Sequence, residues 1–203
     1  MTPEEILAFQ DTKTRAELGD SGAQVNLGIY FYDGKGESYD ILQAVYWFRK
    51  AAEQGVVQAQ YFLGNLYYFG ERVTKDQVQA IFWYRKAAEQ GDPFTQNILG
   101  MCYLEGDCVA KDTEQAVYWF RKAAQQGFSD GQALLGVCYY TGDGVCKDAI
   151  EAYAYLNLAA LTNQGACRYL ADIVKEMSPE LVVAGQNRSK ELHKEIKENM
   201  GVR

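Results

Sequence analysis

A short segment recurs at a constant spacing along this chain, and this recurrence constrains the fold more than any other feature. Residues 43–55, QAVYWFRKAAEQG, return with a single change at 115–127, and a looser copy lies midway at 79–91, so the spacing is 36 residues each time. A fixed period of this length is typical of stacked units that bury their apolar faces against their neighbours. The sequence therefore predicts an array of repeats.

Each period contains two helical patterns, and the first is marked by a leucine followed by a glycine. The leucines are Leu27, Leu63, Leu99 and Leu135. Glycine inside a helix costs about 1 kcal/mol relative to alanine. Because this glycine recurs at the same position in every repeat, we expect the backbone of another helix to pass close to it.

The second helix of each period has its own start signal. An aspartate is followed three residues later by Gln or Glu, which is the spacing of a reciprocal capping box; the aspartates are Asp40, Asp76, Asp112 and Asp148. Beyond the cap, Ala44, Trp47, Phe48 and Ala51 recur at helical spacings and form one apolar face. Gly34 and its equivalents suit the position at the end of the first helix, where the backbone often adopts the left-handed conformation.

The period sets the limits of the repeats within what we expect to be a single solenoid domain over residues 1–203. Residues 3–19 fit the second half of a repeat and predict an N-terminal capping helix. The four helix-turn-helix repeats are predicted at 20–55, 56–91, 92–127 and 128–165. Residues 166–203 predict C-terminal capping helices, and the last helix, which begins at Ser178 and Pro179, is expected to cover the end of the stack with Leu181, Gly185, Leu192 and Ile196.

The repeated motifs resemble those of a known family. Residues 131–139 read GQALLGVCY, residues 142–148 read GDGVCKD, and residues 47–55 read WFRKAAEQG. In this respect the chain is similar to Sel-1-like repeat proteins, which are related to the tetratricopeptide repeat, over about residues 20–165. The resemblance implies an all-α fold, a right-handed α-α superhelix whose first helices line a concave face, and a role as an adaptor or scaffold. Cys108 departs from the pattern, because Gly144 shows that a glycine fits this place in the turn.

A secreted, cysteine-rich branch of that family has been associated with β-lactam binding, and this chain departs from it. Those proteins carry cysteines near the end of one second helix and the start of the next first helix. Here the corresponding residues are Ala52, Ala88 and Ala124 on one side and Ala23, Ala59 and Thr95 on the other. The five cysteines that are present are an odd number crowded into the second half, so we expect reduced thiols.

The overall charge and the absence of targeting signals limit the location and the partners. The formal net charge is −7, which disfavours a nucleic acid partner. No stretch approaches the roughly 18 apolar residues of a membrane span, and the first residues do not resemble a signal peptide. We expect a cytoplasmic protein without membrane association, although an exported form with its signal removed has the same features.

The sequence does not contain a convergent catalytic or metal-binding set. Its single histidine, His193, lies in a charged helix, so we expect no enzyme activity, no metal and no cofactor. One alternative is a small-molecule-binding or hydrolase-type protein, suggested by the cysteine-rich relatives and by Glu105 with Asp107. Another is self-assembly through the solenoid ends, and a redox role for Cys108 and Cys146 stays open.

Comparison among the repeats identifies a candidate partner-binding surface. Positions that are constant hold the stack together, so positions that vary at helical spacing mark a face that the fold does not dictate. On the first helices, in the predicted concave groove, these positions are Val25, Ile29, Tyr32, Tyr61, Asn65, Tyr68, Phe69, Asn97, Met101, Leu104, Glu105, Ala133, Val137 and Tyr140. Tyr, Met and Phe are enriched in interface cores, although single members can instead fill contacts between neighbouring helices.

The charge pattern narrows the expected partner. The first-helix segments 20–33, 56–70, 92–106 and 128–142 contain no Lys or Arg, which disfavours an anionic ligand and favours an apolar or amphipathic peptide or protein. Basic pairs such as Arg49 and Lys50 lie on the second helices instead. They can bind an acidic partner, but we expect a solvated face in which Arg49 pairs with Glu53 and Arg85 with Glu89.

Overall fold

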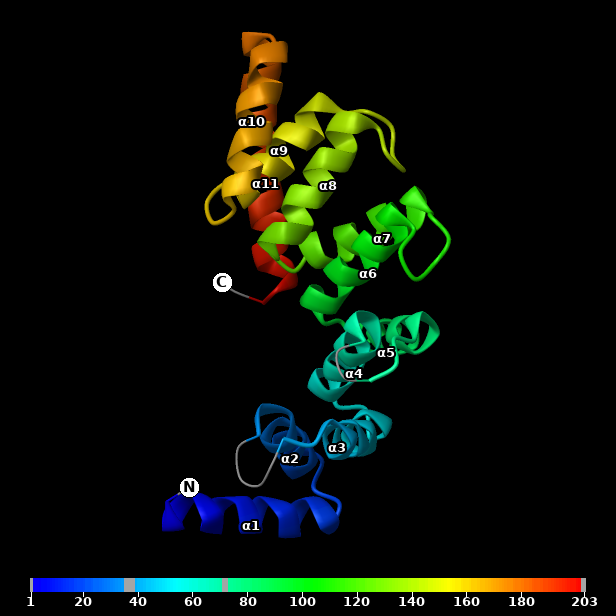
Figure 1. Ribbon diagram of the computed structural model, residues 1–203. Helices are drawn as coiled ribbons and strands as arrows, with labels where there is room; N and C mark the ends of the chain where they lie inside the picture. Colours follow the sequence, from blue (N-terminus) through cyan, green and yellow to red (C-terminus); the bar gives the residue numbers. More distant parts are fainter. Residues whose placement is uncertain (1, 35–38, 71–72, 202–203) are drawn as a thin grey trace. The chain divides into compact units, whose positions relative to one another are not determined.

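All regular structure in the described part of the chain is helical. The computed structural model describes residues 2–34, 39–70 and 73–201, and over these residues it contains eleven helices and no strand (Figure 1). The helices are α1 Pro3–Glu17, α2 Ser21–Asp33, α3 Ile41–Glu53, α4 Val57–Phe69, α5 Gln77–Glu89, α6 Pro93–Glu105, α7 Thr113–Ala124, α8 Ser129–Thr141, α9 Ala149–Ala159, α10 Gln164–Glu176 and α11 Pro179–Asn199. The all-α solenoid with four helix-turn-helix repeats and flanking helices is confirmed.

The helices form two compact units. Unit 1 is Met1–Gln90 and contains α1 to α5, and unit 2 is Gly91–Arg203 and contains α6 to α11. In both units each repeat supplies a first helix (α2, α4, α6, α8) and a second helix (α3, α5, α7, α9) that pack against each other. The single domain and the right-handed superhelix stay predictions.

The starts of the second helices confirm half of the predicted capping box. Asp40 accepts hydrogen bonds from the backbone N–H groups of Leu42 and Gln43 at 3.0 and 3.1 Å, and the other three aspartates cap in the same way. The reciprocal half is wrong. The backbone N–H of Asp40 donates to the Phe31 carbonyl at 3.1 Å, and Asp76 donates likewise to Tyr67 at 2.9 Å. The cap therefore ties each second helix to the first helix of its own repeat.

Left-handed residues end the first helices as expected. Gly34, Gly70, Gly106 and Gly142 have φ angles of 70°, 67°, 75° and 86°. Two residues after Gly106, Cys108 adopts φ 67°, close to the 70° of its equivalent Gly144. The turn thus keeps its backbone shape although a cysteine replaces the glycine.

The recurring glycine of the first helix lies against an aromatic ring. A Cβ atom on Gly28 would lie 2.6 Å from two ring carbons of Phe48, and one on Gly100 would lie 2.5 Å from Cε1 of Phe120. Gly64 contacts the ring of Tyr84 in the same way. The predicted close approach is correct, but the neighbour in these three repeats is chiefly a side chain of the second helix, not its backbone.

In unit 2 the last helix covers the second helices. Helix α11 lies beside α9 (Figure 1), with Gly185 against the Tyr153 ring and Arg188 bonded to Glu151 at 2.6 Å. Leu192 and Ile196 join a core cluster with residues of α7 and α9. Leu181 is exposed, so its predicted place in the covering surface is wrong. The fourth repeat departs from the pattern because α9 is covered in this way.

Replacing Gly64 by alanine is expected to lower stability. The new methyl group would displace the buried Tyr84 ring, and overpacking costs about 1–3 kcal/mol, against a helix-propensity gain of about 1 kcal/mol. We expect a net loss of up to about 2 kcal/mol in the unfolding free energy measured with urea. Gly22→Ala is the control, because Gly22 is exposed in the first turn of α2. An equal effect of the two changes would contradict the packing explanation.

Candidate partner-binding surfaces

The structure places the predicted surface residues in different environments. Val25 is only 3% exposed and belongs to the core of unit 1, so it is not available to a partner. Ile29 and Leu104 also pack against core clusters. Tyr32, Phe69, Met101 and Glu105 are exposed. The remaining residues are half-buried or line cavities.

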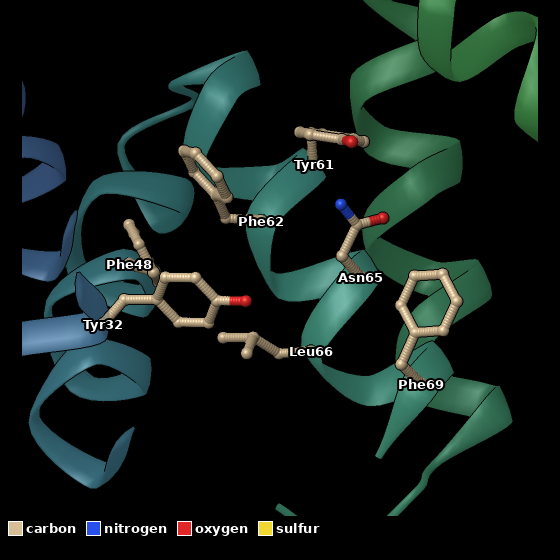
Figure 2. Close-up of a pocket in the computed structure, with 7 residues that line it drawn as sticks. All are labelled: Tyr32, Phe48, Tyr61, Phe62, Asn65, Leu66 and Phe69. Carbon is tan, nitrogen blue, oxygen red and sulfur yellow. The ribbon is translucent and has the colours of Figure 1, made fainter. Parts of the chain in front are cut away.

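Unit 1 contains a half-open cavity of about 240 Å³ on its first-helix side (Figure 2). Its lining consists of Tyr32, Phe48, Tyr61, Phe62, Asn65, Leu66 and Phe69. Tyr32, Tyr61, Asn65 and Phe69 are predicted members of the surface. Three were missed, because Phe48 was assigned to packing and neither Phe62 nor Leu66 lies on the selected stripe. None of the lining side chains carries a charge.

The side chains of this cavity differ in how firmly they are held. Phe48 is fully buried and stacks on Phe62 with ring centroids 4.8 Å apart. Asn65 lies between Tyr61 and Phe69 on α4 (Figure 2), and its Oδ1 accepts a hydrogen bond from the Tyr84 hydroxyl at 2.7 Å. The core of the unit therefore orients both sides of the cavity.

The outer edge of the cavity is apolar and exposed. Phe69 is 62% exposed and Tyr32 is 37% exposed. Tyr68 does not line the cavity, but its ring contacts Phe69 edge to face at 5.0 Å. Lys75, which follows α4, places Nζ 5.5 Å from the centre of the Tyr68 ring. The Lys75 ammonium group, in the turn after α4, thus lies near a surface formed by helices α2 and α4, which contain no Lys or Arg.

Unit 2 contains a second cavity on its first-helix side, with a volume of about 250 Å³. The predicted residues Asn97, Met101, Ala133 and Val137 line it, together with Asp130, Leu134 and the helix α10 residues Gly165, Ala166 and Tyr169, and Asn163, the N-cap of α10. The contribution of α10 was missed because it was treated as a cap. The signal was present, since Tyr169 follows Ala133 by one period of 36 residues.

Two other predicted residues of unit 2 lie outside this cavity. Tyr140 donates a hydrogen bond from its hydroxyl to the Glu176 carboxylate at 2.9 Å, which ties α8 to α10. Glu105 is exposed at the end of α6 and lines neither cavity. The first-helix sides of both units thus present small apolar cavities next to exposed aromatic or sulfur-containing side chains.

The repeat pattern identifies the family. A family model described as the Sel1 repeat matches residues 21–56, 57–92, 93–128 and 129–161. The chain belongs to the Sel1 repeat family. Each of the first three matches begins and ends one residue after the predicted limits of its repeat. Sel1 repeat proteins are generally scaffolds for protein interactions and typically not enzymes.

Solved structures of other Sel1 proteins resemble this chain. A Sel1 repeat protein from Oxalobacter formigenes is 36% identical, with a TM-score of 0.75 over 83% of this chain and 49% of its own. A protective antigen of uropathogenic Escherichia coli, c5321, has an SLR fold and is 32% identical, with a TM-score of 0.55 over 91% of this chain and 48% of its own. The chain therefore spans about half the length of both relatives.

A third structure supports the fold alone. A Sel1 repeat protein from Klebsiella pneumoniae is 22% identical, with a TM-score of 0.52 over 91% of this chain and 99% of its own. The comparison with curated proteins gave no match. Among the described residues of the chain, no helix has the length and apolar character needed to cross a membrane.

The basic residues of the Sel1 signature form contacts within the fold. Arg49 donates from Nη2 to the Tyr67 hydroxyl of the next repeat at 2.6 Å, so the predicted pairing with Glu53 is wrong. Arg121 donates likewise to Tyr139 at 3.1 Å. The lysines that follow these positions lie beside exposed rings, with Lys50 Nζ 5.7 Å from the centre of Tyr46. The arginines connect successive repeats instead of forming a free ladder.

The histidine and the two acids that were candidates for a catalytic role lie outside both cavities. Within the described residues, no group of three or more His, Cys, Asp and Glu side chains is placed to hold a metal ion. His193 is exposed on α11. Asp107 lines neither cavity, and Glu105, as noted, is also outside them. The hydrolase-type alternative therefore has no site in these cavities on which to rest.

The cysteines fall into two classes. Cys102 and Cys138 are buried, and burial raises the pKa of the Cys102 thiol to about 12 and that of the Cys138 thiol to about 11. Cys146 and Cys167 are exposed, Cys108 is half-buried, and no disulfide joins any of the five cysteines. Reactive cysteines typically have a low thiol pKa, so the raised pKa values of Cys102 and Cys138 indicate unreactive thiols.

Thiol labelling is expected to follow these classes. Iodoacetamide at pH 8 should modify Cys146 and Cys167 quickly and leave Cys102 and Cys138 unmodified in the folded protein, as read by peptide mass spectrometry. Rapid labelling of Cys102 at pH 8 would contradict this assignment.

The buried thiols also predict how stability depends on pH. Because folding raises the pKa of these thiols above the ordinary 9.0, their contribution to stability is complete below pH 9 and is lost as pH rises toward 11 and 12. The urea midpoint should therefore fall above pH 9, and less steeply in Cys138→Ala.

Proposed function

We propose that this chain is a non-enzymatic interaction module that binds a protein or peptide partner through the first-helix sides of its Sel1 repeats, with the unit 1 cavity as an anchor site. The observation that carries this proposal is the uncharged aromatic lining of that cavity beside Phe69, which is 62% exposed. Aromatic anchors that fill or border small pockets dominate the binding energy of many interfaces.

The size of the cavity favours a partner side chain. Pockets for drug-sized molecules usually measure about 300–1,000 Å³, and this one measures about 240 Å³ and is open to solvent. One large apolar side chain of a partner fits such a space better than a whole cofactor. The proposal therefore includes no cofactor, and it favours a protein partner over the small-molecule alternative.

The chemistry of the surroundings supports an uncharged or amphipathic contact segment. The α2 and α4 helices, which supply most of the lining, contain no Lys or Arg. An anionic group would find no charge-assisted donor among the lining residues. The general role of Sel1 proteins as interaction scaffolds agrees with this view. We also propose a cytoplasmic location and no nucleic acid or membrane partner. The alternative to a different protein partner is self-association through the ends of the solenoid.

The proposal is tested by changing the exposed edge of the cavity. In affinity capture from the native cell, quantified by mass spectrometry, Phe69→Ser and Tyr32→Ser together should reduce the specific partner about tenfold or more, which corresponds to at least about 1.4 kcal/mol. The matched control is Phe82→Ser, because Phe82 is a similarly exposed aromatic residue on the second helix α5. Equal losses from the two sides, or no loss from the Phe69 side, would reject the anchor site.

A further inference from the structure

Two grooves with the same lining lie on the second-helix side of unit 1. Their volumes are about 480 and 460 Å³, and both open to solvent. In each groove an alanine, a glycine, an aromatic residue, a tryptophan and a lysine occupy the same positions of the repeat. These residues are Ala16, Gly19, Tyr46, Trp47 and Lys50 in the first groove, and Ala52, Gly55, Phe82, Trp83 and Lys86 in the second. The two open grooves are therefore copies of each other, one repeat apart.

The fourth repeat has the same groove, but there the last helix of the chain fills it. Three periods after the first groove, the equivalent positions hold Ala124, Gly127, Ala154, Tyr155 and Leu158. Leu192 and Ile196 of α11 belong to one core cluster with all of these residues except the glycine. A Cβ atom on Gly127 would lie 3.5 Å from Ile196 and 3.7 Å from Met200. Apolar side chains four residues apart on a helix thus fit this groove.

The open grooves of unit 1 expose the surface that α11 covers in the fourth repeat. A Cβ atom on Gly19 would meet no described atom within 4 Å, and one on Gly55 would meet only Oε1 of Gln90 at 4.0 Å. Tyr46 and Phe82 are 49% and 46% exposed, whereas Ala154 at the same position is fully buried. A helix that lies on these rings would remove apolar surface from water, which favours association.

Charge distinguishes the open grooves from the filled one. Glu17, Lys50 and Glu53 line the first groove, and Glu53, Lys86 and Glu89 line the second. In the fourth repeat the lysine position holds Leu158, which is 9% exposed beneath α11. An occupant of the open grooves must therefore carry charges of both signs beside its apolar residues.

We propose that each open groove binds an amphipathic helix of a partner protein, with two aliphatic side chains four residues apart and charged residues of both signs beside them. The aliphatic pair packs on the exposed ring and the tryptophan, in the way that Leu192 and Ile196 pack in the fourth repeat. Insertion of the apolar stripe of a helix into a groove is a common mode of recognition. This inference goes beyond the proposed function, because the open grooves share no residue with the unit 1 cavity.

The test uses the full chain, with a peptide copied from α11 as the probe. The peptide has the sequence of residues 186–201 with capped ends. Short helices are marginal in water, so a lactam between Lys190→Glu and Lys194, which are exposed positions of α11, holds the peptide helical. The control peptide differs only by Leu192→Ser and Ile196→Ser.

Tryptophan side chains in the grooves report on binding. The chain contains three tryptophans, so labelling with fluorotryptophan gives three ¹⁹F signals, and Trp47→Phe and Trp83→Phe assign the two that line the open grooves. We expect the α11 peptide to shift both signals with a Kd of about 1 mM or tighter, and the control peptide to bind about tenfold more weakly or worse.

A pair of matched variants locates the binding surface. Tyr46→Ser with Phe82→Ser removes the exposed rings of both grooves and should weaken the α11 peptide about tenfold. The control is Leu42→Ser with Val78→Ser, because these residues are exposed on the same two helices, α3 and α5, but line neither groove. If the variant without the rings does not fold, the comparison of the two peptides on the unchanged chain still decides.

Three outcomes overturn the inference. These are tryptophan signals that the helical α11 peptide does not move at about 5 mM, well above millimolar Kd values, equal binding of the two peptides, or equal weakening by the two pairs of substitutions. Failure here is distinguishable from failure of the proposed function, because Phe69 and Tyr32 line neither groove. In the capture experiment, Phe82→Ser should release a ligand of the groove and retain a ligand of the unit 1 cavity.

Discussion

The contact between a glycine of the first helix and an aromatic ring of the second helix determines the geometry of three repeats. Phe48, Tyr84 and Phe120 lie against Gly28, Gly64 and Gly100 where a Cβ atom would clash. A ring this close fixes the rotation of the first helix about its own axis, because only the glycine side accepts it. Residues three or four positions from a glycine share its side of the helix, so Tyr32, four after Gly28, and Tyr61, three before Gly64, lie beside this contact. The candidate surface is therefore a consequence of the packing.

The same rings connect the core to the unit 1 cavity. Tyr84 packs on Gly64, and its hydroxyl donates to Asn65, while Phe48 packs on Gly28 and stacks on Phe62 in the lining. A residue that is constant among the repeats for packing can thus also border a binding surface. A partner side chain in this cavity would touch the groups that hold the repeat together, so binding and local stability are coupled there.

The sequence predicted most of the fold and only part of the candidate surfaces. Helix starts at Asp40, left-handed ends at Gly34 and the repeat period depend on local chemistry, which a single sequence displays. The partners of Arg49 and of the Asp40 backbone N–H could not be read from it, because they lie on other helices and the local alternatives, Glu53 and Gln43, had suitable spacing. Helix α10 was predicted, but its contribution to the unit 2 cavity was missed for a different reason, since its period continues while its motif does not.

Differences among the repeats have two physical causes, and exposure separates them. At the position of Lys50 the fourth repeat has Leu158, which is 9% exposed because α11 covers α9. At the position of the exposed Tyr46 it has the buried Ala154. These changes serve the chain's own last helix. Phe69 also differs from its equivalents, but it stays 62% exposed beside a cavity. A departure that buries apolar surface is explained by folding, whereas the exposed Phe69 ring is not, and its place beside the cavity is what supports the proposed binding role.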